Sequence, residues 1–177
     1  MIRRRRKNRF VVDASVVRAA GSSEHPTSSA CRSLLFRIRS VCHHVVLTPE
    51  LKEEWDRHES QVSQQWRASM RSLRKVDDLN PATEDALRDL ITSRMGLANE
   101  RQQMQKDLRL IEAALEADLI VVSLDNRART AFANLARYSK VLCSVKWINP
   151  VDDRERLTAW LEGRATADRD WRLDRQA

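Results

Sequence analysis

Two short apolar runs, each followed by an aspartate, constrain the fold of this chain most. The run from Phe10 to Val12 leads directly into Asp13. The run from Leu119 to Val122 is followed three residues later by Asp125. Continuous runs rich in β-branched residues are typical of strands buried on both faces of a parallel sheet. Because such sheets bind ligands at the carboxyl edge of their strands, both aspartates are expected at a functional edge.

Taken singly, each aspartate also has a simpler interpretation. The chain holds 25 acidic residues, so two of them can follow strands by chance. An Asp between a strand and a helix is often an N-cap, whose carboxylate accepts backbone N–H groups. Capping therefore stays open as the role of either residue.

A third acidic position is predicted on the helix after a second strand, at 44–47. Thr48 and Pro49 are typical of a helix start, which puts Glu50 and Glu54 on one helical face. Either glutamate can face the strand ends. For Glu54, a solvated face beside charged neighbours is an equally good interpretation.

The fourth acid is Asp107, which precedes an apolar stripe at helical spacing: Leu108, Ile111, Ala114 and Leu115. We expect a helix to begin there and to place Asp107 at the border of the buried face. Carboxylates gathered at one sheet edge are natural ligands of Mg²⁺ or Mn²⁺, and such ions activate water for the hydrolysis of phosphodiesters. The glycine-rich loop of phosphate-binding proteins is excluded, since the chain has three glycines and none are clustered.

Together these segments resemble the PIN-domain family of metal-dependent ribonucleases, which includes many toxins of toxin–antitoxin pairs. The similar stretches are 11–17, 44–55, 106–129 and 145–150. The resemblance implies a three-layer α/β/α fold with a central parallel sheet, here with a long helical insertion. It also implies an RNA-cleaving Mg²⁺ or Mn²⁺ site formed by Asp13, Glu54, Asp107 and Asp125. Two further residues, Ser15 and Asn126, take supporting positions beside it, and an antitoxin protein is an expected partner.

The net charge of +7 is concentrated at the N-terminus, and the rest of the chain is close to neutral. Such an arm neutralises phosphates and gives salt-dependent affinity without base specificity, so we expect it to bind RNA. A solubilising tail is the alternative interpretation. The cations of the arm are Arg3, Arg4, Arg5, Arg6, Lys7 and Arg9.

The chain is expected to form one nuclease domain at 9–162, after a basic arm at 1–8 and before a polar tail at 163–177. Strands are predicted at 9–12, 44–47, 119–122 and 145–148, and helices at about 27–41, 126–138 and 151–162. The charged segments 49–79 and 82–100 are also predicted to be helical. They would form a helical arm over about 49–105.

Aromatic residues lie in two of these regions. A stripe of Trp55, Trp66, Met70 and Leu73 is interpreted as core or homodimer surface rather than a platform for stacking bases. In the tail, which we expect to fray, Trp171 and Leu173 are apolar residues available for docking on a partner or on the domain itself.

Three irregularly spaced cysteines predict reduced thiols, and no apolar run is long enough to span a membrane, so a cytoplasmic protein is expected. Zinc binding at Cys42, His43 and His44 is disfavoured, because consecutive residues on a strand point to opposite faces.

Two other functions remain open. The same fold with an incomplete site would be a non-catalytic RNA- or protein-binding scaffold. A phospho-acceptor receiver domain also has Asp at strand ends, but its acidic pair and late lysine have no clear counterpart in this sequence.

Overall fold

A parallel sheet organises residues 7–176, the part of the chain that the computed structural model describes. Within these residues the sheet has five strands in the order β3-β2-β1-β4-β5, and every neighbouring pair is parallel. The strands are β1 (Arg9–Val12), β2 (His44–Leu47), β3 (Val76–Asp78), β4 (Ile120–Val122) and β5 (Lys146–Ile148). The predicted α/β class with a central parallel sheet is confirmed.

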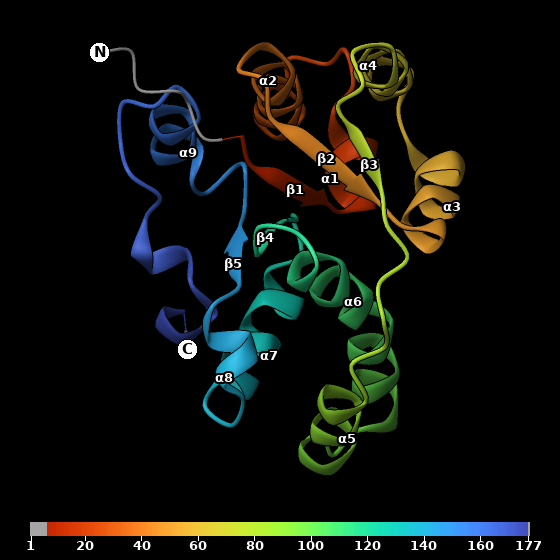
Figure 1. The fold of residues 1–177 in the computed structure, drawn as a ribbon, viewed down its shortest axis with the longest axis vertical. Coiled ribbons are helices and arrows are strands. Elements are labelled where there is room, and N and C mark those ends of the chain that lie inside the picture. The colour runs from red at the N-terminus through yellow and green to blue at the C-terminus, as the bar shows by residue number, and fades with distance from the viewer. Residues whose placement is uncertain (1–6, 177) are drawn as a thin grey trace.

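Helices connect the strands and cover both faces of the sheet. Within the described residues they are α1 (Ala14–Ala19), α2 (Pro26–Ser40), α3 (Pro49–His58), α4 (Gln61–Ser72), α5 (Asp85–Arg94), α6 (Ala98–Leu115), α7 (Asn126–Ala136), α8 (Lys140–Cys143) and α9 (Arg154–Leu161), followed by the short 3-10 helices η1 (Arg169–Trp171) and η2 (Leu173–Arg175). In Figure 1, α2, α4 and α9 lie on one side of the strands and α6 and α7 on the other. This arrangement has the expected three layers.

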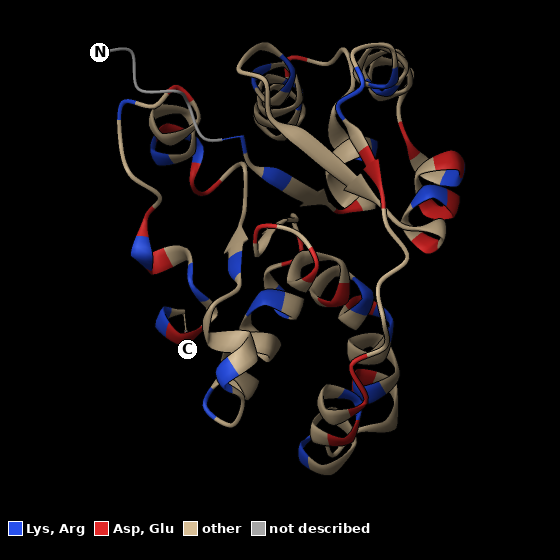
Figure 2. Cartoon of the chain, viewed as in Figure 1, with Lys and Arg blue, Asp and Glu red and all other residues tan. Residues whose placement is uncertain are grey.

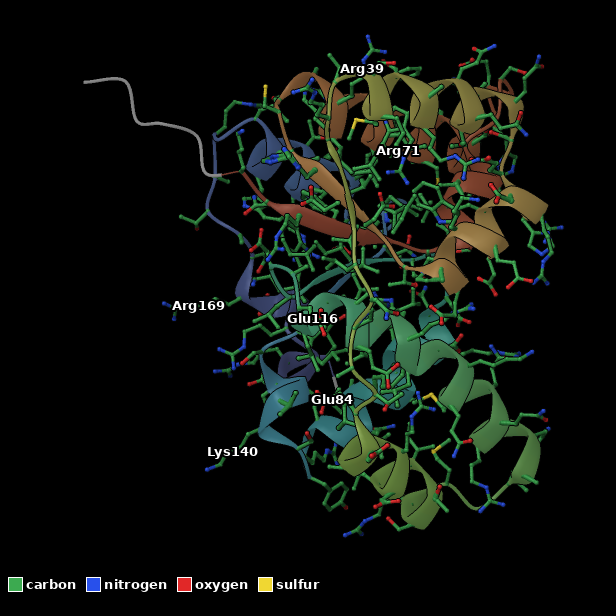
Figure 3. The ribbon with its side chains drawn as sticks, turned by 45° about the vertical axis from the view of Figure 1, so that its right-hand side comes forward. Arg39, Arg71, Glu84, Glu116, Lys140 and Arg169 are labelled. Atoms are coloured by element: carbon green, nitrogen blue, oxygen red, sulfur yellow. The ribbon has the colours of Figure 1, made fainter. Side chains whose placement is uncertain are left out.

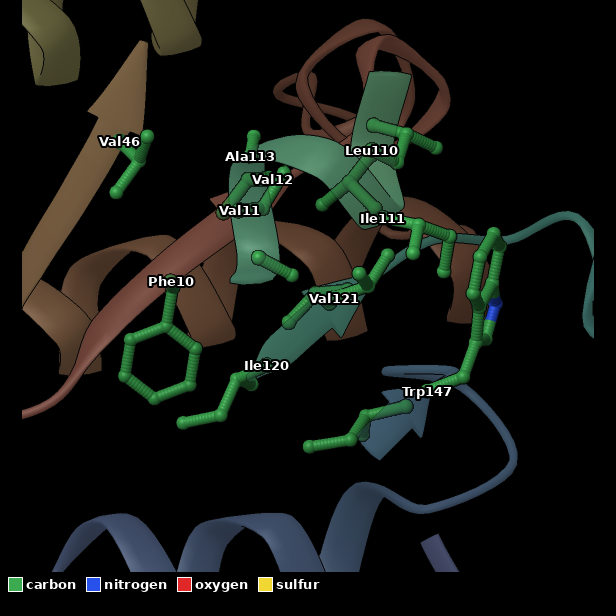
Figure 4. Packing of buried hydrophobic residues seen from close by; sticks show 14 of the residues in the cluster. Phe10, Val11, Val12, Val46, Leu110, Ile111, Ala113, Ile120, Val121 and Trp147 are labelled. Carbon is green, nitrogen blue, oxygen red and sulfur yellow. The ribbon is translucent and has the colours of Figure 1, made fainter. Parts of the chain in front are cut away.

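The neighbouring interior strands β1 and β4 are buried because nearly all their side chains are apolar. Phe10, Val11 and Val12 of β1 have no exposed surface, and β4 is equally buried. Figure 4 shows how α6 packs on these strands, with Leu110 and Ile111 near β4. Burial of such side chains contributes about 1.5–3 kcal/mol each. It therefore fixes the strand positions on which the sheet edge depends.

Strand pairing sets which residues meet at the carboxyl edge of the sheet. Val12 of β1 lies opposite Val122 of β4. The ladder continues for one more bond, in which the Asp13 N–H donates to the Val122 carbonyl over 2.9 Å. Asp13 and the residues that follow β4 consequently leave the sheet side by side.

The predicted continuous helical region at 49–79 is wrong. The structure has two helices there, α3 and α4, followed by the edge strand β3. Arg74 has a φ of 56°, which turns the chain back after α4. Val76 is the single apolar residue of β3, so the strand forms through pairing with β2 rather than through its own pattern. Short, charged edge strands of this kind also discourage pairing with other molecules.

The helix containing Asp107 begins earlier than predicted. It is α6, which starts at Ala98, so Asp107 lies near its middle. The α5–α6 hairpin extends away from the sheet (Figure 1). A linker from β3 runs along α6, where the Ala82 N–H donates to Glu116 and the Glu84 N–H to Glu112, both over 2.9 Å (Figure 3). The helical arm is therefore this hairpin alone, and not the whole of 49–105.

The aromatic stripe predicted at 55–73 is mostly core. Trp55 and Trp66 lie on different helices, are buried, and have ring centroids 6.1 Å apart. Met70 is also buried, whereas Leu73 is 50% exposed. Core packing, and not base stacking, is thus the role of the two tryptophans.

The C-terminal segment after Gly163 packs on the domain instead of fraying. Trp171 and Leu173 are buried, and the Leu173 N–H donates to the Val145 carbonyl over 2.9 Å. Docking on the domain itself, one of the two alternatives for these residues, is what the structure shows. Across residues 7–176 we find no helix long and apolar enough to cross a bilayer.

Candidate metal centre

A cavity of about 260 Å³ lies at the carboxyl edge of β1 and β4. Its acids come from the residue after β1, from α3, from α6 and from the residue before α7, and α1 adds Ser15 and Arg18 to the lining. These four elements bring together all the acids predicted as metal ligands, with Ser15 beside them: Asp13, Glu54, Asp107 and Asp125. Segments far apart in sequence thus converge on one site.

Two serine hydroxyls hold the Asp13 carboxylate. Ser15 Oγ and Ser123 Oγ both donate to Asp13 Oδ2, over 2.5 and 2.8 Å. Each serine oxygen also accepts a backbone N–H, Ser15 from Leu124 and Ser123 from Asp125. The end of β1 and the turn after β4 therefore form one hydrogen-bonded unit. Ser123 was not predicted, although its position directly after a buried strand was a usable signal.

Asp125 is both a helix cap and a cavity residue. Its Oδ1 accepts the N–H groups of Arg127 and Ala128, each over 2.9 Å, at the start of α7. The capping interpretation is confirmed. It does not compete with a ligand role, since a carboxylate has a second oxygen and further lone pairs.

Asp107 is the most deeply buried of the four acids. It is 9% exposed, and Gln103 Nε2 donates to both of its oxygens over 3.1 Å. Burial raises the pKa of Asp107 to about 6; the Gln103 hydrogen bond opposes this, while the nearby charges of Asp125 and Asp13 add to it. The structure therefore disfavours the ionised form of Asp107, mainly because the carboxyl group is buried and to a smaller extent because Asp125 and Asp13 are close.

Glu54 is the acid of α3 that faces the cavity. It forms an ion pair with Arg109 of α6, with 2.5 Å between Oε1 and Nη2. Glu53 pairs instead with Arg57 along the helix, and Glu50 lines a separate cavity. Figure 2 shows the mixed charges of α3. The solvated-face interpretation describes Glu53, whereas Glu54 is turned inward.

Asn126 does not face the four acids. Its amide donates to Asp152 over 3.1 Å and accepts from Asn149 over 3.0 Å. It lines a neighbouring cavity of about 1000 Å³, which Asp107 and Asp125 also border. The structure therefore places the predicted supporting residue next to the site rather than inside it.

Basic side chains surround the acids, and sequence reasoning missed them. They are Arg18, His58, Lys106 and Arg109. They come from α1, α3 and α6, so no local spacing linked them to one another or to the acids. The cavity consequently has anionic groups that suit a cation and cationic groups that suit a phosphate.

The predicted RNA-binding arm is described only in part. Arg3, Arg4, Arg5 and Arg6 lie outside the described residues, and Lys7 is exposed. Arg9 is the first residue of β1, where its N–H donates to Asp118 over 2.8 Å and its guanidinium lies 3.8 Å from the same carboxylate. Because Asp13 follows the other end of β1, the arm joins the sheet at the edge opposite the acids.

The donor set of the cavity fits a hard divalent cation, because carboxylate and hydroxyl oxygens are the ligands that Mg²⁺ and Mn²⁺ prefer. As the side chains lie, no three His, Cys, Asp or Glu residues of the described chain converge on one point. Each acid is turned toward a protein partner instead. Cation binding therefore requires the carboxylates to turn from these partners toward a common point, which is a side-chain change within one cavity. Asp107 is the acid that a cation would affect most, because burial, with the charges of Asp125 and Asp13, raises its pKa and a bound cation would favour its ionised form.

The chain matches no protein-family model, and no curated protein shows significant similarity to it. Function must therefore be inferred from the residues of the site and their chemistry, since a fold by itself supports many activities.

Proposed function

We propose that the protein is a metal-dependent phosphodiesterase, and more specifically a PIN-like endoribonuclease. One observation carries the proposal: four acids from four separate elements line a single cavity at the carboxyl edge of the central strands. Ligands of open α/β sheets bind at this edge.

The residues of the cavity divide into three roles. Asp13, Asp107 and Asp125 would hold Mg²⁺ or Mn²⁺, and Glu54 completes the anionic set. Ser15 and Ser123 fix the orientation of Asp13. The ion would supply Lewis-acid stabilisation of the scissile phosphate and lower the pKa of the attacking water. Lys106, His58 and Arg18 line the same cavity and are placed to bind the phosphates of the substrate.

RNA is the proposed substrate because of the basic arm and the resemblance to PIN domains described above. The same resemblance supports a toxin role with an antitoxin partner. Cys31, Cys42 and Cys143 are free thiols, which agrees with a reducing compartment such as the cytoplasm.

A cleavage assay tests the proposal directly. Purified full-length protein should cut a labelled RNA of mixed sequence in Mn²⁺ and should lose this activity in EDTA. Asp13→Asn and Asp125→Asn should both be inactive while keeping their circular dichroism spectra. The matched control is Asp170→Asn, an exposed aspartate of η1, which should cut normally. Full activity in either site variant would disprove the assignment.

A non-catalytic scaffold is the second candidate. The Glu54–Arg109 ion pair favours it, because a cationic side chain already neutralises one of the four acids. A scaffold would bind RNA or a protein partner with no requirement for Mn²⁺. Binding of RNA that is unaffected by EDTA, without cleavage, would favour this function.

A further inference from the structure

Arg109 is a cation built into the candidate metal centre. It lies two residues after Asp107 on α6 and reaches the carboxylate of Glu54 on α3, with 2.5 Å between Nη2 and Oε1. Its side chain is 22% exposed. The charge is therefore held largely inside the protein, next to the acids.

The guanidinium has donor capacity that the described residues leave unused. Arg109 Nε is buried and has no hydrogen-bond partner among them. A guanidinium presents five N–H donors in a fixed plane, so one pair with Glu54 leaves others directed elsewhere. Arg109 borders two cavities. One is the cavity lined by the four acids, and the other is the separate cavity lined by Glu50.

The charges of the cavity limit how many cations it can accept. Four carboxylates face it, and Arg109 compensates that of Glu54. Three aspartates remain, and one divalent ion reduces their net charge from −3 to −1, which Lys106 and Arg18 of the same cavity offset. A second divalent ion would have to occupy the region beside Glu54 that the guanidinium holds, and the two cations would repel each other.

We propose that Arg109 takes the place of a second metal ion, so that the centre binds one divalent cation on Asp13, Asp107 and Asp125. This inference rests on the proposed metal-dependent function. It assigns Glu54 the role of holding Arg109, and it makes Arg109 a positioning residue whose charge stays in the site when the ion leaves.

A purely structural interpretation of the same contact is that Arg109 ties α6 to α3. Under that interpretation, loss of the guanidinium lowers stability but changes nothing in cation binding. If Arg109 instead takes the place of a second ion, loss of its positive charge opens a second cation position at Glu54. The number of ions bound therefore separates the two interpretations, and it is measured without any assay of activity.

The experiment counts Mn²⁺ bound to the full-length protein by isothermal titration calorimetry and by electron paramagnetic resonance of the free ion. Wild type should bind one Mn²⁺ per chain, and Arg109→Gln should bind two. Arg109→Lys keeps the positive charge and should still bind one. Arg88→Gln is the matched control, because Arg88 pairs with Glu112 over 2.8 Å outside this cavity, and it should also bind one.

Several outcomes would overturn the inference. Two ions in the wild type would show that Arg109 occupies no cation position, and one ion in a folded Arg109→Gln would show that its charge excludes none. The Lys variant keeps the test valid if the Gln variant unfolds, because two ions in Arg109→Lys would also contradict the charge argument. A wild type that binds one ion but cuts no RNA would disprove only the nuclease function, and one that binds none would remove both.

Discussion

Ser123 donates a hydrogen bond of 2.8 Å to the Asp13 carboxylate, although 110 positions separate the two residues in the sequence. Parallel pairing of β1 with β4 makes this contact possible, because it brings the ends of the two strands together. The hydroxyl fixes an acid of the proposed centre and at the same time accepts the Asp125 N–H over 3.0 Å. One small side chain thus positions two acids.

Ser123→Ala should therefore weaken the site as well as the fold. Ser123 is fully buried, so its loss leaves a carboxylate and a backbone N–H each without one partner. We expect a loss of about 1–3 kcal/mol in unfolding free energy and roughly tenfold weaker Mn²⁺ binding. Urea denaturation and calorimetry measure the two effects. Ser72→Ala, at an exposed helix end, is the control, and equal Mn²⁺ affinity in both variants would contradict the positioning role.

The two roles of Asp125 can be separated by comparing two substitutions. Asparagine is as good an N-cap as aspartate, so Asp125→Asn should keep the stability of wild type while losing Mn²⁺ binding. Alanine removes the cap too, and Asp125→Ala should cost about 1 kcal/mol more. Thermal unfolding of both variants in EDTA tests this. If the two variants melt at the same temperature, the cap does not contribute to stability.

The sequence predicted best those elements whose pattern does not depend on distant partners. The boundaries of β1 and β2 match the predicted strands, because continuous β-branched runs have few other uses. Strand β3 was missed because Val76 is its only apolar residue and its conformation comes from pairing with β2. The early start of α6 was missed for a related reason, since Leu97 at its N-cap makes no side-chain capping bond.

The acids were predictable and their partners were not. Asp13 and Asp125 follow recognisable strands, and Glu54 follows a recognisable helix start in which Thr48 Oγ accepts the Leu51 N–H over 3.2 Å. Nothing in the sequence distinguishes Arg109 from other charged helix residues, because its pairing with Glu54 depends on how the fold places α3 relative to α6. Long side chains that meet across elements carry no local signature, so the basic residues of the cavity required the structure.

Glu54 and Glu50 should differ in their effect on cation binding. Glu54→Gln leaves the Arg109 charge uncompensated beside the three aspartates, so Mn²⁺ affinity should fall about tenfold or more. Glu50 is exposed in the first turn of α3 and lines another cavity. Glu50→Gln should leave the affinity unchanged and cost less than about 1 kcal/mol through the helix dipole. Calorimetry measures the Mn²⁺ affinity of both variants. A larger loss of affinity in Glu50→Gln than in Glu54→Gln would place the metal site one helical turn nearer the start of α3.

Removal of the N-terminal arm should weaken RNA binding mainly at low salt. The deletion should cover residues 1–7 and spare Asn8, whose N–H donates to His43 and whose carbonyl accepts from His44. Five cations are lost, so the slope of log affinity against log salt should flatten by up to about 3.5 for single-stranded RNA. Fluorescence anisotropy at several salt concentrations measures this slope. An unchanged slope would favour the solubilising-tail interpretation.

Asp107→Asn should stabilise the protein in a pH-dependent way. Burial raises the pKa of Asp107 to about 6 in the folded state, whereas the ordinary pKa of an aspartate, which applies to the unfolded chain, is 3.8. Between these values the folded state binds more protons than the unfolded state, so Asp107 makes wild-type stability fall as the pH rises from about 4 to 6.

Asparagine cannot ionise, so the stability of the variant should not fall in this way as the pH rises. Its advantage over wild type should grow from pH 4 to pH 7 by as much as about 3 kcal/mol. Urea denaturation in EDTA at both pH values measures the difference, and the pH-independent cost of changing the Gln103 hydrogen bonds cancels in the comparison. Added Mn²⁺ should make wild type more stable than Asp107→Asn at pH 7, because the ion binds the ionised carboxylate that only wild type has. A difference that stays constant with pH would contradict the raised pKa of Asp107.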